Sequence, residues 1–190
     1  ADQDLEIMQA LRQETDAVLR VDANCAWTAE QTVEMSHALH ELDIEFIEQP
    51  LPATASAADK EYVYKNSVLP VIADESCMHE DDVIRCVDRF HGINVKLSKC
   101  GGLTPAFRML KKARELGLKT MAGCMIESDV AIGAALQLSP LLDFADLDGS
   151  VLLAEQPFTG VSIINGTMAK PIGVGTGVSA IAASTEVSNY

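Results

Sequence analysis

The chain has 190 residues, with 14 Lys or Arg and 28 Asp or Glu, so its formal net charge at pH 7 is −14. A surface of this sign repels phosphate backbones and anionic lipid headgroups, so we expect neither nucleic acid nor a membrane as a partner. Hydrophobic residues make up 48% and charged residues 22%, which is the balance of a globular chain and excludes a disordered one.

The sequence start and the cysteine pattern indicate a cytoplasmic protein. ADQDLEIMQ is acidic where a secretory signal is basic and then apolar, and no apolar run approaches the ~18 residues of a membrane-spanning helix. The cysteines are odd in number, widely spaced and never form CxxC. We therefore predict reduced thiols, without a disulfide framework or zinc site, at Cys25, Cys77, Cys86, Cys100 and Cys124.

Strand-like and helical segments alternate along the chain. Residues 4–15 form the first predicted helix, because Leu5, Met8 and Leu11 share one apolar stripe. Apolar, strand-forming runs then follow, each succeeded by a helical pattern. The predicted strands are 18–24, 44–50, 69–76, 93–99, 118–128 and 144–149, and the predicted helices are 28–42, 55–65, 80–89, 104–116 and 130–138. Thr28 is a suitable helix start and Gly117 a helix stop.

This alternation predicts an α/β fold with a parallel sheet. Polar residues recur at the strand ends every 22 to 28 residues, at Asp22, Glu48, Asp74, Lys96, Cys124 and Asp146. Right-handed crossovers at this pitch build either an open sheet or a barrel, and both bind ligands at the carboxyl ends of the strands. A closed barrel needs about eight strands and only six are predicted, so we expect a truncated barrel.

We expect one domain over residues 1–190, with β/α repeats in 1–157 and a C-terminal segment in 158–190. That segment is rich in Gly, Ser, Thr and Ala, with weak strand character at VSIING and a turn-rich stretch at IGVGTGV. Neither pattern indicates an independent second domain.

Three carboxylates end consecutive predicted strands at equal steps. Asp22, Glu48 and Asp74 are 26 residues apart, and neighbouring parallel strands lie about 4.8 Å apart. Three acids brought this close repel one another unless a cation neutralises them, and Mg²⁺ prefers such oxygen ligands. We therefore predict a Mg²⁺ site, with Asn24 and Glu75 nearby; the alternative is that the acids cap helices or pair with bases.

Lys96 occupies the corresponding position on the next strand. A lysine beside a metal in a barrel mouth can have its pKa lowered and act as a base, although Lys96 could instead be a structural partner of the acids. Lys99, three residues later, is expected to point elsewhere and to belong to the surroundings of the metal ligands, with Asn24 and Glu75.

Further acids follow the last two predicted strands. Asp146 and Asp148 are two residues apart on the final strand and so share one side of it, from which they could bind a substrate ammonium. Glu127 is a further candidate for substrate binding, and the alternative for all three is a solvated barrel rim. His37 and His40 form HxxH without a third ligand, so we expect them at the surface.

The ordered motifs VDAN, IEQP, ADES, NVKLSKCGG, GCMIES and DLD resemble those of the enolase superfamily. Within it, the sequence is similar to the mandelate racemase and muconate-lactonising branch, and there to dipeptide epimerases such as the L-Ala-D/L-Glu epimerases. The resemblance extends over residues 4–177. It implies a modified TIM-type (β/α) barrel, of which this chain holds the third to eighth strands. It also implies one Mg²⁺ per active site on Asp22, Glu48 and Asp74, and Lys96 as an acid/base catalyst.

The activity implied by the resemblance is a 1,1-proton transfer at the α-carbon of a dipeptide through a metal-stabilised enolate. In the family, a K-x-K pair on an earlier strand supplies the opposite base, and an N-terminal domain caps the barrel. Neither is in this sequence, so we expect the chain alone to be inactive and to form a homo-oligomer or associate with a missing N-terminal part. Asp146 and Asp148 favour an epimerase over a muconate cycloisomerase or o-succinylbenzoate synthase.

The sequence leaves two other functions open besides an epimerase. An incomplete barrel has exposed strand edges, so the chain could be a noncatalytic fragment that binds a metal or a partner. Lys96 could also form a Schiff base with a carbonyl substrate, as in an aldolase.

Overall fold

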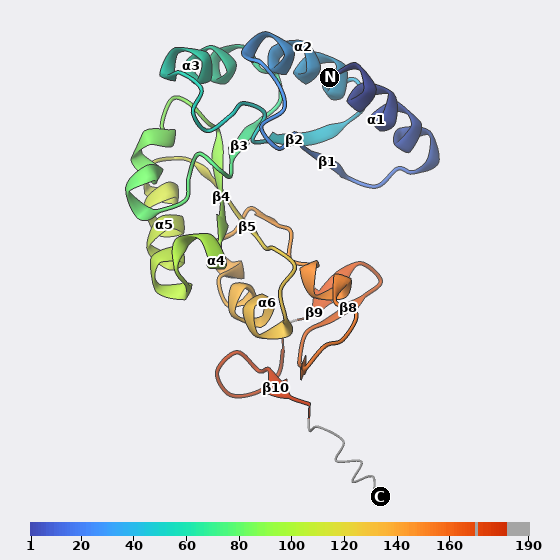
Figure 1. Ribbon diagram of the computed structural model, residues 1–190, viewed down its shortest axis with the longest axis vertical. Helices are drawn as coiled ribbons and strands as arrows, with labels where there is room; N and C mark the ends of the chain where they lie inside the picture. Colours follow the sequence, from blue (N-terminus) through green and yellow to red (C-terminus); the bar gives the residue numbers. More distant parts are fainter. Residues whose placement is uncertain (170, 182–190) are drawn as a thin grey trace, which may run out of the picture.

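The computed structural model describes residues 1–169 and 171–181. Predictions for residue 170 and for residues 182–190 lie outside the described residues. Its helices and strands alternate in the first three quarters of the chain (Figure 1). In chain order the elements are α1 (Asp2–Glu14), β1 (Leu19–Asp22), α2 (Ala29–His40), β2 (Ile44–Glu48), α3 (Ala57–Asn66), β3 (Val71–Ala73), the 3₁₀ helix η1 (Glu80–Cys86), β4 (Gly92–Lys96), α4 (Leu97–Cys100), α5 (Leu103–Glu115), β5 (Lys119–Gly123), α6 (Asp129–Leu136), η2 (Ser139–Leu141), β6 (Phe144–Ala145), η3 (Gly149–Leu152), β7 (Phe158–Thr159), β8 (Ser162–Ile164), β9 (Thr167–Ala169) and β10 (Ser179–Ala180).

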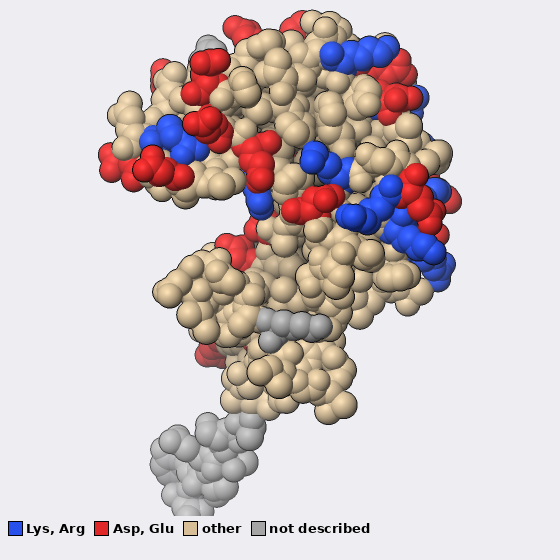
Figure 2. Space-filling model, turned by 180° about the vertical axis from the view of Figure 1, so that it is seen from behind, with Lys and Arg blue, Asp and Glu red and all other residues tan. Residues whose placement is uncertain are grey.

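β1 to β6 form one parallel sheet in the order of the chain, which confirms the predicted topology. The sheet is curled, and its helices cover the convex side, so the molecule is a half-barrel (Figure 1). β1 and β6 are the two edges of the sheet within the described residues. The space-filling view is deeply hollowed between the two ends of the curl (Figure 2).

Local sequence signals fix the start of α2 and the end of α5. The Thr28 hydroxyl accepts the backbone N–H of Gln31, and the Gln31 side chain accepts the backbone N–H of Thr28, so α2 starts with a capping box. Gly117 follows α5 with φ +78°, a conformation that glycine adopts without a steric penalty. Both residues were predicted as helix boundaries.

The structure corrects four predicted elements. The strand predicted over 118–128 ends at Gly123, so Glu127 lies beyond it and not at its end. Residues 80–89 were predicted as an α-helix, but the segment forms the short 3₁₀ helix η1, which Asp82 fixes by accepting the backbone N–H groups of Met78 and His79. The strand predicted to Lys99 ends at Lys96, because the chain turns into α4, which Gly101 terminates at φ +94°. The last strand keeps only two residues, Phe144 and Ala145.

Apolar side chains fill both faces of the sheet. On the convex side the strands pack against the helices through residues such as Val71, Ile93 and Leu110, all fully buried. Inside the curl, Phe46, Ile72 and Met121 form a smaller cluster against Phe144. Residues buried on both faces are typical of parallel strands, which is why these runs are continuously apolar in the sequence.

The C-terminal segment packs onto the half-barrel. β8 and β9 form an antiparallel hairpin, which confirms strand character at VSIING, and β7 pairs with β10. Val161 and Met168 pack against the cluster that contains Ala122 and Ile132. Within residues 1–169 and 171–181, no helix has the length and apolar character needed to cross a membrane.

His91 ties β3 to the start of β4 and makes stability depend on pH. Its Nδ1 accepts the backbone N–H of Val71 at 3.0 Å, and its ring lies against Tyr64. Burial lowers the pKa of His91, and the charge of Lys119 lowers it further. Because the folded state holds the neutral ring, His91 contributes stability above its unfolded-state pKa of about 6.5. This contribution is lost as the pH falls from that value through the lower pKa of the folded state.

We expect unfolding midpoints of the protein that carries this chain to fall between pH 7.5 and pH 5.5 more steeply than those of a His91→Asn variant. The Asn amide oxygen can accept the same N–H without titrating. Because one histidine binds at most one proton, the free energies of unfolding of the two proteins can diverge by at most about 1.4 kcal/mol per pH unit. Thermal melts at a series of pH values measure it, and parallel curves for the two proteins would contradict it.

Candidate functional site

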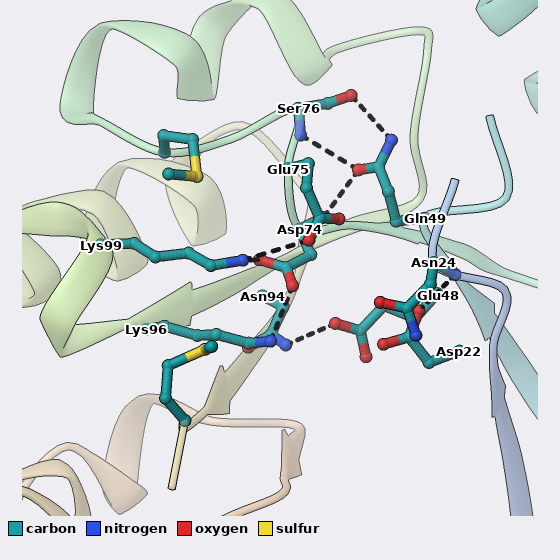
Figure 3. A network of polar contacts seen from close by, with 12 residues as sticks. Asp22, Asn24, Glu48, Gln49, Asp74, Glu75, Ser76, Asn94, Lys96 and Lys99 are labelled. Atoms are coloured by element: carbon teal, nitrogen blue, oxygen red, sulfur yellow. Dashed lines mark hydrogen bonds and ion pairs between the residues drawn. The ribbon is translucent and has the colours of Figure 1, made fainter. Parts of the chain in front are cut away.

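Three carboxylates lie at the carboxyl ends of β1, β2 and β3 (Figure 3). Asp22 and Glu48 end their strands and are register partners, and Asp74 directly follows β3. Asp74 and Glu48 are buried, with 2% and 4% exposure, whereas Asp22 is exposed toward the open side of the curl. The equal steps in the sequence therefore correspond to neighbouring strands.

Two lysines reach Asp74 from the next strand end. Lys96 Nζ lies 2.7 Å from Asp74 Oδ2, and Lys99 Nζ lies 2.5 Å from Asp74 Oδ1 (Figure 3). Lys99 also pairs with Glu75 at 3.3 Å. The expectation that Lys99 points elsewhere was wrong, because the chain turns into α4 after Lys96 and one helical turn brings Lys99 back over Asp74.

Burial and neighbouring charges raise the pKa of Glu48 and of Asp22. Burial raises the pKa of Glu48 to about 7; the Asn94 hydrogen bond opposes this, and the charges of Asp22 and Asp74 add to it. Burial also raises the pKa of Asp22, and the charges of Glu75 and Asp74 raise it further. The hydrogen bond from the Asn24 backbone N–H lowers it. This is the electrostatic cost expected of carboxylates gathered at one edge of a sheet.

The lysine pKa differs from the expectation. Burial lowers the pKa of Lys96, but the hydrogen bond to Asp74 and the charges of Asp74, Glu48 and Asp22 outweigh burial, and the net shift is upward. The predicted lowering depends on a cation beside Lys96; without that cation the ammonium group faces three acids, which strengthen its hold on the proton.

The carboxylates fit a hard divalent cation by their chemistry. They offer oxygen donors from three adjacent strand ends, and the buried Asn94 Oδ1 beside them has no hydrogen-bond partner. Within residues 1–169 and 171–181, no group of three or more His, Cys, Asp or Glu side chains is arranged closely enough to hold a metal. Asp74 faces the two lysines instead, which neutralise it in this arrangement.

Asn24 and Glu75 both lie beside the carboxylates, as expected. Asn24 has φ +46°, and its backbone N–H donates to Asp22 Oδ1 at 2.8 Å, so the turn orients the Asp22 side chain. Glu75 pairs with Lys99 and accepts the Cys25 thiol at 3.8 Å. Glu75 thereby links the loops after β1 and β3.

Sequence reasoning missed Asn94 as a residue of this site. Its Nδ2 donates to Glu48 Oε1 at 2.7 Å, and a side chain at Gly123 would come within 2.6 Å of it. Gly123 therefore leaves the room that Asn94 and Lys96 occupy. An Asn in a buried strand, two residues before Lys96 and so on the same face, was the signal that could have found it.

Asp146 and Asp148 lie just beyond β6. The expectation that both are on the strand was wrong, because β6 ends at Ala145 and Asp148 is the residue before η3. Their carboxyl groups still interact: burial raises the pKa of Asp146, and the charge of Asp148 adds to it. Asp146 lines the same cavity of about 440 Å³ as Asp22 and Glu48.

Glu127 lies in the loop between β5 and α6, where its Oε1 accepts the backbone N–H of Met125 at 3.3 Å. Burial raises the pKa of Cys124 most, and a hydrogen bond with the Gly149 backbone lowers it. The charges of Asp146, Glu127 and Asp148 all raise the same pKa, so Glu127 lies near the same thiol as the two aspartates. The structure thus brings the three acids together around Cys124.

The remaining sequence candidates lie where expected. All five cysteines are free thiols. His37 and His40 are exposed on α2.

The family of the chain follows from its similarity to known proteins. A family model described as "Enolase C-terminal domain-like" matches residues 1–183. The chain belongs to the enolase C-terminal domain-like family. This confirms the resemblance to the enolase superfamily and the expected half of a TIM-type barrel.

Several of the similar proteins are named as epimerases of dipeptides. An "L-Ala-D/L-amino acid epimerase" of Flavobacterium johnsoniae is 53% identical over 93% of this chain and 52% of its own length. A substrate-liganded L-Ala-D/L-Glu epimerase of Bacillus subtilis matches 95% of this chain and 53% of its own, with 27% identity and a TM-score of 0.88.

A dipeptide epimerase of Enterococcus faecalis, complexed with Mg and the dipeptide L-Leu-L-Tyr, matches 93% of this chain and 52% of its own, with 33% identity and a TM-score of 0.85. The chain therefore spans about half the length of the relatives it matches.

Proposed function

We propose that the protein carrying this chain is a Mg²⁺-dependent epimerase that moves the α-proton of a dipeptide. The observation that carries the proposal is the placement of Lys96 among the strand-end carboxylates Asp22, Glu48 and Asp74. Asp146 lines the cavity that Asp22 and Glu48 also line. The name of the 53% identical relative and the Mg and dipeptide of the Enterococcus structure support it.

In this proposal Asp22, Glu48 and Asp74 hold one Mg²⁺. A bound Mg²⁺ would supply the charge that stabilises the negative charge developing on the substrate and that loosens the hold of the three carboxylates on the Lys96 proton. Asn94 and the Asn24 backbone orient Glu48 and Asp22. Lys99 neutralises the outer oxygen of Asp74.

Lys96 is the acid/base group for one face of the α-carbon. Its Nζ lies at the strand ends beside Asp74, and its side chain is 13% exposed, so it can take a proton from a substrate bound over the carboxylates. Inversion needs a second group on the opposite face, which in the proposal comes from outside residues 1–190. We therefore expect the 190-residue chain alone to be inactive.

Asp146 and Asp148 bind the free ammonium group of the dipeptide, with Glu127 beside them. Three acids around Cys124 make this end of the cavity favourable for a cation. We also propose that residues 1–190 act as one barrel domain, in which 1–157 supply the β/α units and 158–190 are the C-terminal segment. The domain either forms a homo-oligomer or associates with an N-terminal part.

Acetylation of the substrate tests the ammonium site. We expect kcat/KM of the protein that carries this chain to be about 10- to 150-fold higher for an L,L-dipeptide than for its N-acetylated form, because a charge-assisted contact is worth about 1.5–3 kcal/mol. The Asp146→Asn/Asp148→Asn variant should lose that preference. Steady-state kinetics with the four combinations of enzyme and substrate measure it.

An exposed acid provides the control: Glu115→Gln, on α5, should keep the wild-type preference. Indifference of the wild type to acetylation would contradict dipeptide epimerisation and favour a muconate cycloisomerase or an o-succinylbenzoate synthase. Absence of proton exchange with all of these substrates would favour a noncatalytic domain. Trapping of a carbonyl substrate on Lys96 by borohydride would favour an aldolase.

A further inference from the structure

Gln49 is a buried polar residue at the centre of the carboxylate row, and neither the sequence motifs nor the proposed chemistry uses its side chain. It directly follows Glu48, is 0% exposed and has φ +31°, a left-handed conformation that is unusual for a residue other than glycine. Figure 3 shows its carboxamide directed toward Asp74 and Ser76.

The carboxamide of Gln49 makes four hydrogen bonds. Its Oε1 accepts the backbone N–H groups of Asp74 at 2.9 Å and Ser76 at 3.0 Å. Its Nε2 donates to the Leu51 carbonyl at 2.6 Å and to Ser76 Oγ at 2.9 Å. The reversed amide would face two N–H donors with its own NH₂ group, so the contacts determine the orientation.

The backbone of Gln49 adds two links. Its N–H donates to the Ile72 carbonyl and its carbonyl accepts the Cys25 N–H, both at 2.8 Å. One residue thus joins the loop after β1, which follows Asp22, to its own loop after Glu48 and to the loop that holds Asp74. These are the three strand ends that carry the carboxylates.

We infer that Gln49 is a positioning residue that sets the spacing of Asp22, Glu48 and Asp74, so that a divalent cation can bind without reorganising the loops. The inference rests on the proposed function, because it assigns the cation to these acids. Like-charged carboxylates at neighbouring strand ends repel one another, and the bonds that Gln49 makes to all three loops oppose their separation.

Three substitutions separate positioning from general stability. Gln49→Met keeps the length of the side chain but removes all four side-chain hydrogen bonds. Thr120→Val is the matched control, because Thr120 is also 0% exposed and hydrogen-bonded, through Oγ1 to the Leu141 carbonyl, but lies near the opposite end of β5 from Gly123. Ser76→Ala removes only one of the four bonds and leaves the contact with Asp74.

The first measurement is Mn²⁺ binding, followed by electron paramagnetic resonance in the protein that carries this chain. We expect Gln49→Met to weaken Mn²⁺ binding about 10- to 100-fold, as loss of a partner behind a metal ligand does. Ser76→Ala should change binding less than about 3-fold and Thr120→Val should leave it unchanged, even where the melting temperature falls. Wild-type affinity in Gln49→Met would overturn the inference.

The second measurement needs no metal. In the metal-free protein, hydrogen exchange of the Asp74 and Ser76 amides should accelerate at least about 10-fold in Gln49→Met relative to the amides of β5, and not in Thr120→Val. If the wild type binds no Mn²⁺, the metal part of the proposed function fails, and exchange alone decides on Gln49. Selective acceleration then supports its positioning of the strand ends, and unchanged exchange overturns it.

Discussion

Replacing Lys96 with Ala should abolish α-proton exchange for one epimer of a dipeptide and leave it for the other. Lys96 lies at the end of a single strand, β4, on one side of the row of strand-end carboxylates, and proton transfer needs hydrogen-bond reach to the face from which the proton leaves. Loss of a positioned acid/base group lowers the rate about 100- to 10,000-fold. Overall epimerisation, which needs both faces, should fall by the same factor.

The measurement is the incorporation of solvent deuterium at the α-carbon, followed separately from each epimer. The ratio between the epimers is the readout, because Lys96 also pairs with Asp74 and its loss could disturb the carboxylates. Such a disturbance would slow both epimers alike. Lys111→Ala, on the exposed face of α5, serves as the control and should exchange both epimers as the wild type does. Equal loss from both epimers in Lys96→Ala would argue against two bases on opposite faces.

Asp74→Asn should remove both metal binding and turnover. Asp74 is the buried acid between the two lysines, and an amide in its place offers one neutral oxygen donor instead of a carboxylate. Since loss of residues behind metal ligands already weakens binding 10- to 100-fold, we expect Mn²⁺ affinity to fall by more than about 100-fold. Turnover at a fixed Mg²⁺ concentration should fall with it.

The same substitution should also lower the free energy of unfolding. The carboxylate neutralises Lys96 and Lys99, and hydrogen bonds to charged groups contribute about 1.5–3 kcal/mol each. Mn²⁺ titration and urea unfolding of the same preparations separate the two effects. Asp88→Asn is the control, because Asp88 is exposed with φ +58°, a conformation that Asn tolerates. Unchanged Mn²⁺ binding in Asp74→Asn would remove this residue from the proposed site.

Sequence periodicity determined the architecture of this protein. Continuous apolar runs such as IEFIEQP and LPVIADES, each followed by a helical pattern, predict buried parallel strands with helices on the outside. Equal spacing of Asp22, Glu48 and Asp74 then implied neighbouring strand ends, because each β/α unit advances the chain by one strand. These signals are local, so a linear reading could find them.

Only the tertiary structure decided how the side chains pair at those strand ends. Lys99 contacts Asp74 because α4 turns the chain after β4, and Lys96 gains rather than loses proton affinity because Asp22, Glu48 and Asp74 all face it. The four bonds of Gln49 join residues up to 27 positions apart, and its motif IEQP gives no sign of them. Pairing of this kind depends on through-space distances of a few ångströms, which the spacing of residues along a chain does not specify.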